Sequence, residues 1–276
     1  WQAFTTANEV LGQARYRLLT CGAGGVAATA DAGLRLQVDL GMQQSVAVKP
    51  HTVIVPGGDG IHRASADPGT LHWIRQQDAQ TQRTCSVCTG AFLLASAGLL
   101  DGRRVTTHWR SAAQLQQRFP ALTVTDELIF CRSDKYWTTA GVTAGIDLAL
   151  TLIEEDCGVH IAQKVARRLV VYLRRGGDQR QYSQTLRVQD RAGEPFTGLL
   201  QQLEARLAHP WTVDEMADLC HMSRRTFQRK FKQAFGVPPL GVLKNLRTER
   251  YEALVQSGRM TRKEFERSIA ALNAAA

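Results

Sequence analysis

Blocks of apolar residues alternate with polar stretches along the first 175 residues, and they predict strands and helices in turn. The predicted strands are short and rich in β-branched residues; they cover 51–56, 84–87, 105–107, 122–125 and 136–139. The predicted helices cover 68–81, 91–97, 109–119, 142–155 and 160–174. Strands that alternate with helices are typical of a parallel sheet covered on both faces, so we expect an α/β domain.

Residues 211–236 carry a different pattern, with two short helices joined by a tight turn. Thr212 and Glu215 have the spacing of a capping box, Ser223 is placed to cap the second helix, and Gly236 is placed to end it. The apolar residues recur at helical spacing: Val213, Met216, Ala217 and Cys220, then Phe227, Phe231, Ala234 and Phe235. Two capped helices around a short turn predict a helix-turn-helix.

The second of these helices has a basic face. Arg225, Gln228, Arg229 and Lys232 follow the spacing i, i+3, i+4 and i+7. Arginine pairs with guanine and glutamine with adenine in the major groove of DNA, so we expect this face to contact bases. A solvated basic face on an ordinary packed helix is the alternative, and it is the less favoured of the two.

Charge favours a nucleic acid as the partner. The chain has 34 Lys and Arg against 25 Asp and Glu, a net charge of +9. Residues 221–250 alone hold eight basic residues and one acidic residue. Charge concentrated on one helical module favours a DNA backbone over a membrane surface. The longest apolar run, near 91–100, is about half a membrane span, so we expect a soluble, cytoplasmic chain.

Cys88 follows the strand predicted over 84–87 and precedes an apolar helix. A side chain at such a turn has the position of a nucleophile elbow, at the sheet edge where α/β proteins bind ligands. His108 follows the next strand, where it can reach the same crevice. We therefore predict a ligand-binding crevice formed by Gly57, Gly58, Cys88, Thr89 and His108.

Three interpretations of Cys88 and His108 are open at this level. The two residues could form a nucleophilic pair, or they could line a crevice that senses a ligand without reacting. Cys88 could also be a small buried apolar residue. The sequence shows no orienting carboxylate for the pair, so sensing is favoured and we do not predict an enzyme. The six cysteines and seven histidines are scattered and predict neither a metal site nor a cofactor.

A polar stretch separates the two patterns. We predict a linker over 181–195, with Gly193 and Pro195 near its end, between a domain over 1–180 and a helical domain over 196–276. A basic helix precedes the linker and includes Lys164 and Arg168. Contact with DNA and a solvated helix face are both open for it, and the solvated face is favoured.

Several long segments resemble one family. SVCTGAFLLASAGLLDGRRVTTHW, at 86–109, resembles the elbow and histidine segment of the ThiJ/PfpI, class I glutamine amidotransferase-like superfamily. TTAGVTAGIDLALTLIEEDCG at 138–158 and VARRLVVYLRRGGDQRQYS at 165–183 resemble the sensor domain of GlxA-type regulators of the AraC family. PWTVDEMADLCHMSRRTFQRKFKQAFG at 210–236 resembles the first helix-turn-helix of those regulators.

The resemblance implies a flavodoxin-like PfpI domain followed by a helix-turn-helix domain, in a homodimer that binds double-stranded DNA. It implies a small-molecule effector, an amino acid or a quaternary amine, and a Cys88–His108 pair that is a vestige of catalysis. By the same resemblance Arg225 and Arg229 would contact bases beside Gln228. Phosphates would be contacted by Ser223, Arg224 and Lys232. The alternative function is a Cys-dependent, PfpI- or amidotransferase-like hydrolase with an appended helical module.

The chain departs from the family pattern in two places. The family begins with a strand and an acidic loop before the position of Trp1, so we expect the carboxylate that accompanies Cys88 to be missing. The family also has a second helix-turn-helix after a connecting helix, predicted here over 239–257. The residues from Gly258 onward are too few for it, with one helix predicted over 261–272. We therefore expect a chain shortened at both ends and a weak, salt-sensitive grip on DNA.

Overall fold

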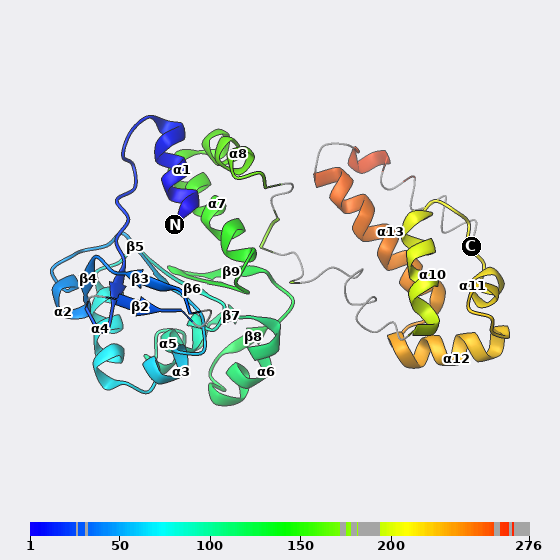
Figure 1. Ribbon diagram of the computed structural model, residues 1–276, viewed down its shortest axis with the longest axis horizontal. Helices are drawn as coiled ribbons and strands as arrows, with labels where there is room; N and C mark the ends of the chain where they lie inside the picture. The colour runs from blue at the N-terminus through cyan, green and yellow to red at the C-terminus, as the bar shows by residue number, and fades with distance from the viewer. Residues whose placement is uncertain are drawn as a thin grey trace. The chain divides into compact units, whose positions relative to one another are not determined.

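The computed structural model describes residues 1–25, 27–30, 33–171, 175–177, 181, 194–256, 260–264 and 267 (Figure 1). The chain forms two compact units, Trp1–Gln181 and Tyr182–Ala276. Most of the predicted linker, residues 182–193, lies outside the described residues, as does most of the helix predicted over 261–272.

The central sheet of the first unit has four strands in the order β5 (Thr52–Val55), β6 (Arg83–Val87), β10 (Tyr136–Thr139) and β9 (Phe130–Ser133). β5, β6 and β10 are parallel, and Thr84 pairs with both Val53 and Tyr136. The prediction of parallel strands is confirmed for these three. The sequence did not predict β9, which runs antiparallel to β10. Asp134, with a φ of 54°, makes the short connection that allows this reversal.

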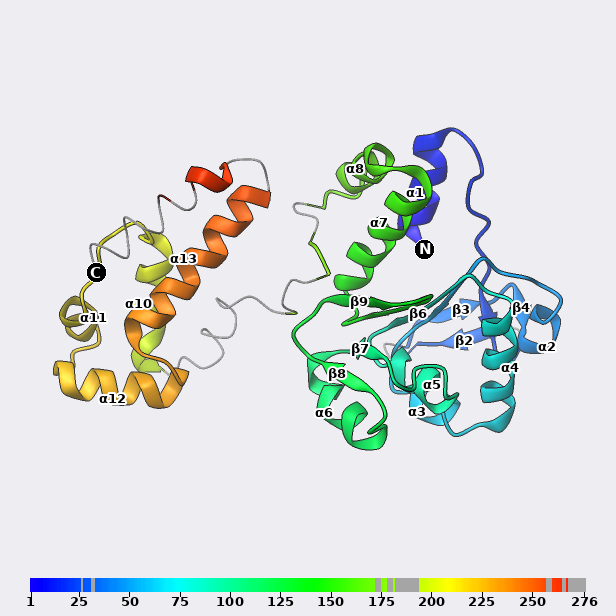
Figure 2. The ribbon, with the colours of Figure 1, turned by 180° about the vertical axis from the view of Figure 1, so that it is seen from behind.

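Helices cover both faces of this sheet (Figures 1 and 2). One layer contains α1 (Gln2–Leu11), α7 (Ala144–Cys157) and α8 (Val159–Arg168); the other contains α3 (Ile61–Ala64), α4 (Pro68–Ala79) and α5 (Gly90–Ser96). β10 contributes side chains to the cores on both faces of the sheet, because neighbouring residues of a strand point to opposite faces. Trp137 therefore packs into the core beneath α7, and Tyr136 into the core beneath α5.

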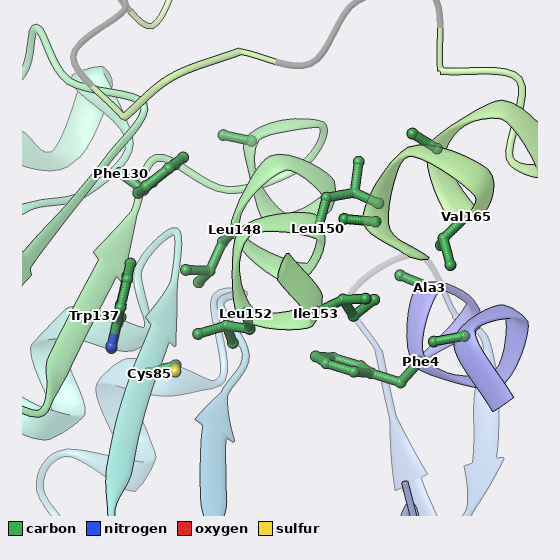
Figure 3. Close-up of a cluster of buried hydrophobic side chains, with 14 of the residues drawn as sticks. Ala3, Phe4, Cys85, Phe130, Trp137, Leu148, Leu150, Leu152, Ile153 and Val165 are labelled. Atoms are coloured by element: carbon green, nitrogen blue, oxygen red, sulfur yellow. The ribbon is translucent and has the colours of Figure 1, made fainter. Parts of the chain in front are cut away.

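The core under α7 is built from aliphatic and aromatic side chains that exclude water. Figure 3 shows Leu148 and Leu152 directed toward Phe130 and Trp137, and Ile153 directed toward Phe4 of α1. Each fully buried side chain of this size stabilises the fold by about 1.5–3 kcal/mol relative to leaving it in water. Packing of this kind holds α1, which lacks a side-chain cap at its N-terminus.

Shorter strands complete the first unit. β7 (Arg104–Thr106) and β8 (Thr123–Thr125) form a parallel pair connected through α6 (Trp109–Arg118). The remaining elements are β1 (Cys21–Gly22), β2 (Ala27–Thr29), β3 (Arg35–Gln37), β4 (Leu40–Gly41) and α2 (Met42–Ser45), with β1 paired to β4 and β2 to β3. The helix predicted over 160–174 ends earlier, at Arg168, because Val170 adopts a φ of 56° that a right-handed helix does not allow.

The second unit is helical, with α10 (Glu194–Ala205), α11 (Val213–Leu219), α12 (Arg224–Phe235) and α13 (Pro239–Gln256). Phe196 of α10 packs edge-on against the buried rings of Phe227, Phe231 and Phe235, with centroids 5.3–6.1 Å away. The connecting helix predicted over 239–257 corresponds to α13.

A buried arginine links α13 to the chain between α10 and α11. The Arg247 side chain is 3% exposed. Its Nε donates to the carbonyl oxygen of Leu207 at 2.8 Å, and its Nη2 donates to that of His209 at 2.6 Å. Because a guanidinium has five donors in a fixed fork, it can hold two carbonyl groups of one loop at once.

Within the described part of the chain, none of the helices is long and apolar enough to cross a membrane.

Candidate functional site

The carboxyl ends of the parallel strands β5, β6 and β10 meet at one edge of the sheet. Gly57, Cys88 and Gly141 follow these strands by one or two residues. A Cβ atom on Gly57 would lie 2.7 Å from the Cβ of Cys88, and a Cβ on Gly141 would overlap the same atom. Two glycines therefore allow the backbone on either side to approach Cys88 closely.

Cys88 has the strained backbone of an elbow residue. Its φ is 55°, a conformation that costs a non-glycine residue about 1–3 kcal/mol unless its surroundings hold it. The N–H of Cys88 donates to the carbonyl of Thr139 at 2.9 Å, and the hydroxyl of Thr107 donates to the carbonyl of Cys88 at 2.7 Å. The side chain is half-buried. The structure thus turns Cys88 sharply between β6 and α5, as a nucleophile elbow requires.

Thr89 fixes the neighbouring loop. Its Oγ1 accepts from the N–H of Gly58 at 2.9 Å and donates to the carbonyl of Gly58 at 3.2 Å. Gly90 packs so closely on β5 that a Cβ there would overlap the carbonyl oxygen of Val55. Four of the five predicted crevice residues, Gly57, Gly58, Cys88 and Thr89, are therefore brought together.

His108, the fifth predicted residue, follows Thr107, whose hydroxyl binds the Cys88 carbonyl, but the His108 ring has another role. It caps α6, with Nδ1 accepting from the N–H of Arg110 at 3.3 Å. Partial burial, and secondly the charge of Arg110, lower the pKa of His108 below its ordinary value of 6.5. In the described part of the chain no hydrogen bond joins His108 to Cys88, and Nδ1 of His108 is engaged as the cap of α6.

Three residues that hold the backbone around Cys88 were not predicted from the sequence. Gly141 has a φ of 96°, and a glycine two residues after a predicted strand is the one signal that could have pointed to it. Thr107 binds the Cys88 carbonyl. Gln181 accepts from the N–H of Trp109 at 2.8 Å and donates to the carbonyl of Thr107 at 2.7 Å. Its position, 72 residues after Trp109, carries no local pattern.

The described residues contain no group of three or more His, Cys, Asp or Glu arranged to hold a metal ion. All six cysteines are free thiols, and Cys85 is buried inside β6.

The helix-turn-helix forms as its caps predict. Thr212 and Glu215 make a reciprocal capping box, with Glu215 Oε2 accepting from the N–H of Thr212 at 2.8 Å. That N–H and the Thr212 hydroxyl lower the pKa of Glu215. Ser223 Oγ accepts from the N–H of Thr226 at 3.4 Å, and Gly236 ends α12 with a φ of 76°. The N-terminus of α11 and both ends of α12 are thus held by caps within a few residues of the helix.

α12 divides into an apolar face and a basic face. Phe227, Phe231 and Phe235 are buried against the rest of the unit. The predicted base-contacting residues are exposed, and the side chains make no hydrogen bond or ion pair with any described residue; they are Arg225, Gln228, Arg229 and Lys232. The basic face is therefore free to meet a partner.

The two residues at the start of α12 are less free. Ser223 uses its hydroxyl as the helix cap. Arg224 forms an ion pair with Asp214 of α11 at 3.0 Å, between side chains that are 60% and 61% exposed. An exposed pair of this kind contributes about 0–1 kcal/mol, so a phosphate can compete for Arg224.

Two families match the chain. Residues 3–155 match the DJ-1/PfpI family, and residues 203–240 match the bacterial regulatory helix-turn-helix proteins of the AraC family. The five predicted crevice residues lie in the first range, and α11 and α12 lie in the second.

Individual proteins match as well. The HTH-type transcriptional regulator GbdR of Pseudomonas aeruginosa is 30% identical over 256 residues, 92% of this chain and 68% of the relative. Isonitrile hydratase of Pseudomonas putida is 44% identical over 117 residues, 42% of this chain and 50% of that enzyme. The crystal structure of a ThiJ/PfpI family protein from Pseudomonas syringae matches with a TM-score of 0.53 and 26% identity, over 62% of this chain and 69% of that one.

The DJ-1/PfpI match covers more than half of the chain, and the similarity to a regulator covers most of it. The chain therefore belongs to the DJ-1/PfpI family, in the form that joins this domain to an AraC-type helix-turn-helix.

Proposed function

We propose that the chain is a sequence-specific, DNA-binding transcription regulator whose first unit binds a small-molecule effector in the crevice around Cys88. The observation that carries this proposal is the basic face of α12, which is exposed and unpaired among the described residues while the opposite face is buried. A helix that reads base edges in a major groove presents arginine and glutamine in this way, and this observation supports the proposal.

Roles follow for the individual side chains. Arg225 and Arg229 contact bases beside Gln228, and Ser223, Arg224 and Lys232 contact phosphates. Phosphate contacts fix the position of the helix, whereas base contacts distinguish sequences. The domain bounds of this proposal are 1–180 for the effector domain, 181–195 for the linker and 196–276 for the DNA-binding domain.

The effector belongs to the class that the family resemblance implies, an amino acid or a quaternary amine, and Gly57, Gly58, Cys88, Thr89 and His108 line its site. No cofactor is required for such binding. The regulator acts as a homodimer in the cytoplasm, where its DNA is. Light scattering of the purified chain measures the dimer directly.

The test is selection of bound sequences from random DNA at moderate salt, followed by titration of the selected site. Arg225→Ala and Arg229→Ala should each lose about 1–3 kcal/mol on the selected site and much less on random DNA. Lys230→Ala removes the same charge from an exposed position outside the row and should weaken both DNAs equally. Equal losses for all three variants would contradict base contacts by Arg225 and Arg229.

A thiol-dependent hydrolase or hydratase is the second candidate. The elbow backbone of Cys88 and the 44% identity to isonitrile hydratase favour it. The capping role of the His108 ring speaks against it, because a nucleophile needs an adjacent base. We therefore expect no Cys88-dependent turnover of an isonitrile, ester or amide panel. Turnover that disappears in Cys88→Ala would establish the enzyme instead.

A further inference from the structure

Gln181 holds the backbone on both sides of His108. Its Nε2 donates to the carbonyl of Thr107 at 2.7 Å, and its Oε1 accepts from the N–H of Trp109 at 2.8 Å. His108 therefore lies between Thr107 and Trp109, the two residues that the Gln181 side-chain amide binds. Displacement of that amide would break both hydrogen bonds to the backbone that carries the His108 ring.

The Gln181 amide is fully engaged. Nε2 also lies 3.1 Å from the hydroxyl of Thr106 and 3.2 Å from the carbonyl of Leu128, so three acceptors surround its two donors. The backbone N–H of Gln181 donates to the carbonyl of Glu127 at 2.9 Å. A partly buried amide with this number of partners has one preferred position, because leaving it loses several hydrogen bonds at once.

One residue separates Gln181 from Cys88. The Thr107 hydroxyl donates to the carbonyl of Cys88 at 2.7 Å, while the Thr107 carbonyl accepts from Gln181. Gln181 is also the last residue of the first unit, and the second unit begins at Tyr182. Gln181 therefore binds the segment that holds the Cys88 carbonyl, and along the chain it is the last residue before the second unit.

We propose that Gln181 is a positioning residue that links the occupancy of the crevice to DNA binding by the second unit. This inference rests on the proposed function. An occupant that contacts His108 or Cys88 changes the free energy of the Thr107–Trp109 segment, and therefore that of the anchored position of Gln181. Linkage requires the reverse effect as well: a change in DNA occupancy alters binding in the crevice by the same factor.

Alkylation of Cys88 with iodoacetamide supplies a defined occupant of the crevice. The Cys88 sulfur forms a bond to the carbamidomethyl carbon, iodide leaves and the thiol proton is released. DNA affinity for the selected site and amide hydrogen exchange of the peptides covering 107–109 and 181 are measured before and after labelling. Cys88→Ser treated in the same way reports any effect of the other thiols.

In the wild-type chain, labelling should change the DNA dissociation constant by about 5-fold or more and alter exchange at Trp109 and Gln181. Gln181→Ala should bind DNA with a response below about twofold. Gln181→Glu keeps the acceptor for Trp109 but loses the donor to Thr107, and its response should be intermediate. Gln163→Ala, an exposed change on α8, should keep the wild-type response.

The outcomes separate this inference from the proposed function. A wild-type chain with no preference for any DNA sequence refutes the proposed function. In that case amide hydrogen exchange at Trp109 and Gln181 still decides whether labelling of Cys88 affects the position of Gln181. Wild-type DNA binding that labelling leaves unchanged, with exchange also unchanged, overturns the inference alone. A full response in Gln181→Ala overturns it as well, and thermal unfolding of that variant confirms that it is folded.

Discussion

The crevice around Cys88 and the basic face of α12 present their functional groups by opposite means. In the crevice, residues that follow three strands converge, two glycines permit close backbone approach and Cys88 adopts a positive φ. On α12, regular helical spacing arranges the side chains, and caps within a few residues hold the helix. The crevice therefore depends on long-range packing, whereas the basic face depends on local sequence and on one buried aromatic face.

The largest expected effect tests the aromatic face. Phe231 is fully buried, so Phe231→Ala should destabilise the second unit by about 3–5 kcal/mol. The first unit should keep its own unfolding transition, measured by calorimetry. Gln233→Ala, an exposed change on the same helix, should stay within about 0.5 kcal/mol. A single shared transition that shifts as a whole would show that the two units do not unfold independently.

The next effect tests the close approach in the crevice. Gly141→Ala forces a methyl group onto Cys88 at a φ of 96°, so we expect a loss of about 2–4 kcal/mol in the first unit. Gly145→Ala is the matched change four residues later. Its Cβ would meet Val87 at an ordinary 3.7 Å, and alanine inside a helix is more stable than glycine by roughly 0.5–1 kcal/mol.

Urea unfolding of both glycine variants gives the comparison. Opposite signs support a crevice built on backbone proximity. If Gly141→Ala is as stable as wild type, the close contact with Cys88 does not exist in solution.

A smaller effect tests local capping. Thr212→Ala removes the hydroxyl that accepts from the N–H of Glu215, and should cost about 1 kcal/mol in the second unit. Thr197→Ala, at an exposed position within α10, provides the control and should change stability by less than about 0.5 kcal/mol. Urea unfolding followed by circular dichroism measures both; equal values would mean that the cap contributes nothing.

The smallest effect is a pH dependence of the crevice. Burial first, and Arg110 second, lower the pKa of His108 in the folded state. The folded chain then binds the proton more weakly than the unfolded chain. The stability contributed by the neutral ring is therefore fully present above pH 6.5 and is lost as the pH falls through the folded pKa.

NMR titration of the His108 ring measures that pKa directly. His108→Gln should remove this part of the pH dependence of unfolding. A His108 ring that titrates above pH 6.5 would contradict the described environment.

The contrast between local and long-range order also decides what the sequence could predict. The caps at Thr212, Ser223 and Gly236 and the basic row of α12 follow from spacing within one turn or two, and the structure confirms the helix they predict. The crevice glycine Gly57 and the elbow Cys88 were found because each follows a recognisable strand. Their use in effector binding stays a prediction.

Features that rest on distant partners were missed. α1 has no side-chain cap and is held by packing of Phe4 and Ala7 against the core. β9 mixes polar and apolar residues, and pairing with β10 is what makes it a strand. Gln181 forms five hydrogen bonds, all with residues more than 50 positions earlier in the chain. The residues next to Gln181 in the sequence show no pattern that predicts these bonds.

Arg247 bears on how the DNA-binding part could be moved to another protein. Its guanidinium joins the middle of α13 to carbonyl groups that precede α11. A graft that carried α11 and α12 alone would lose this link together with α10 and α13, and would expose the apolar sides of both helices. The smallest transplantable segment therefore begins with α10 and ends with α13, and an arginine outside the helix-turn-helix helps to set that minimum.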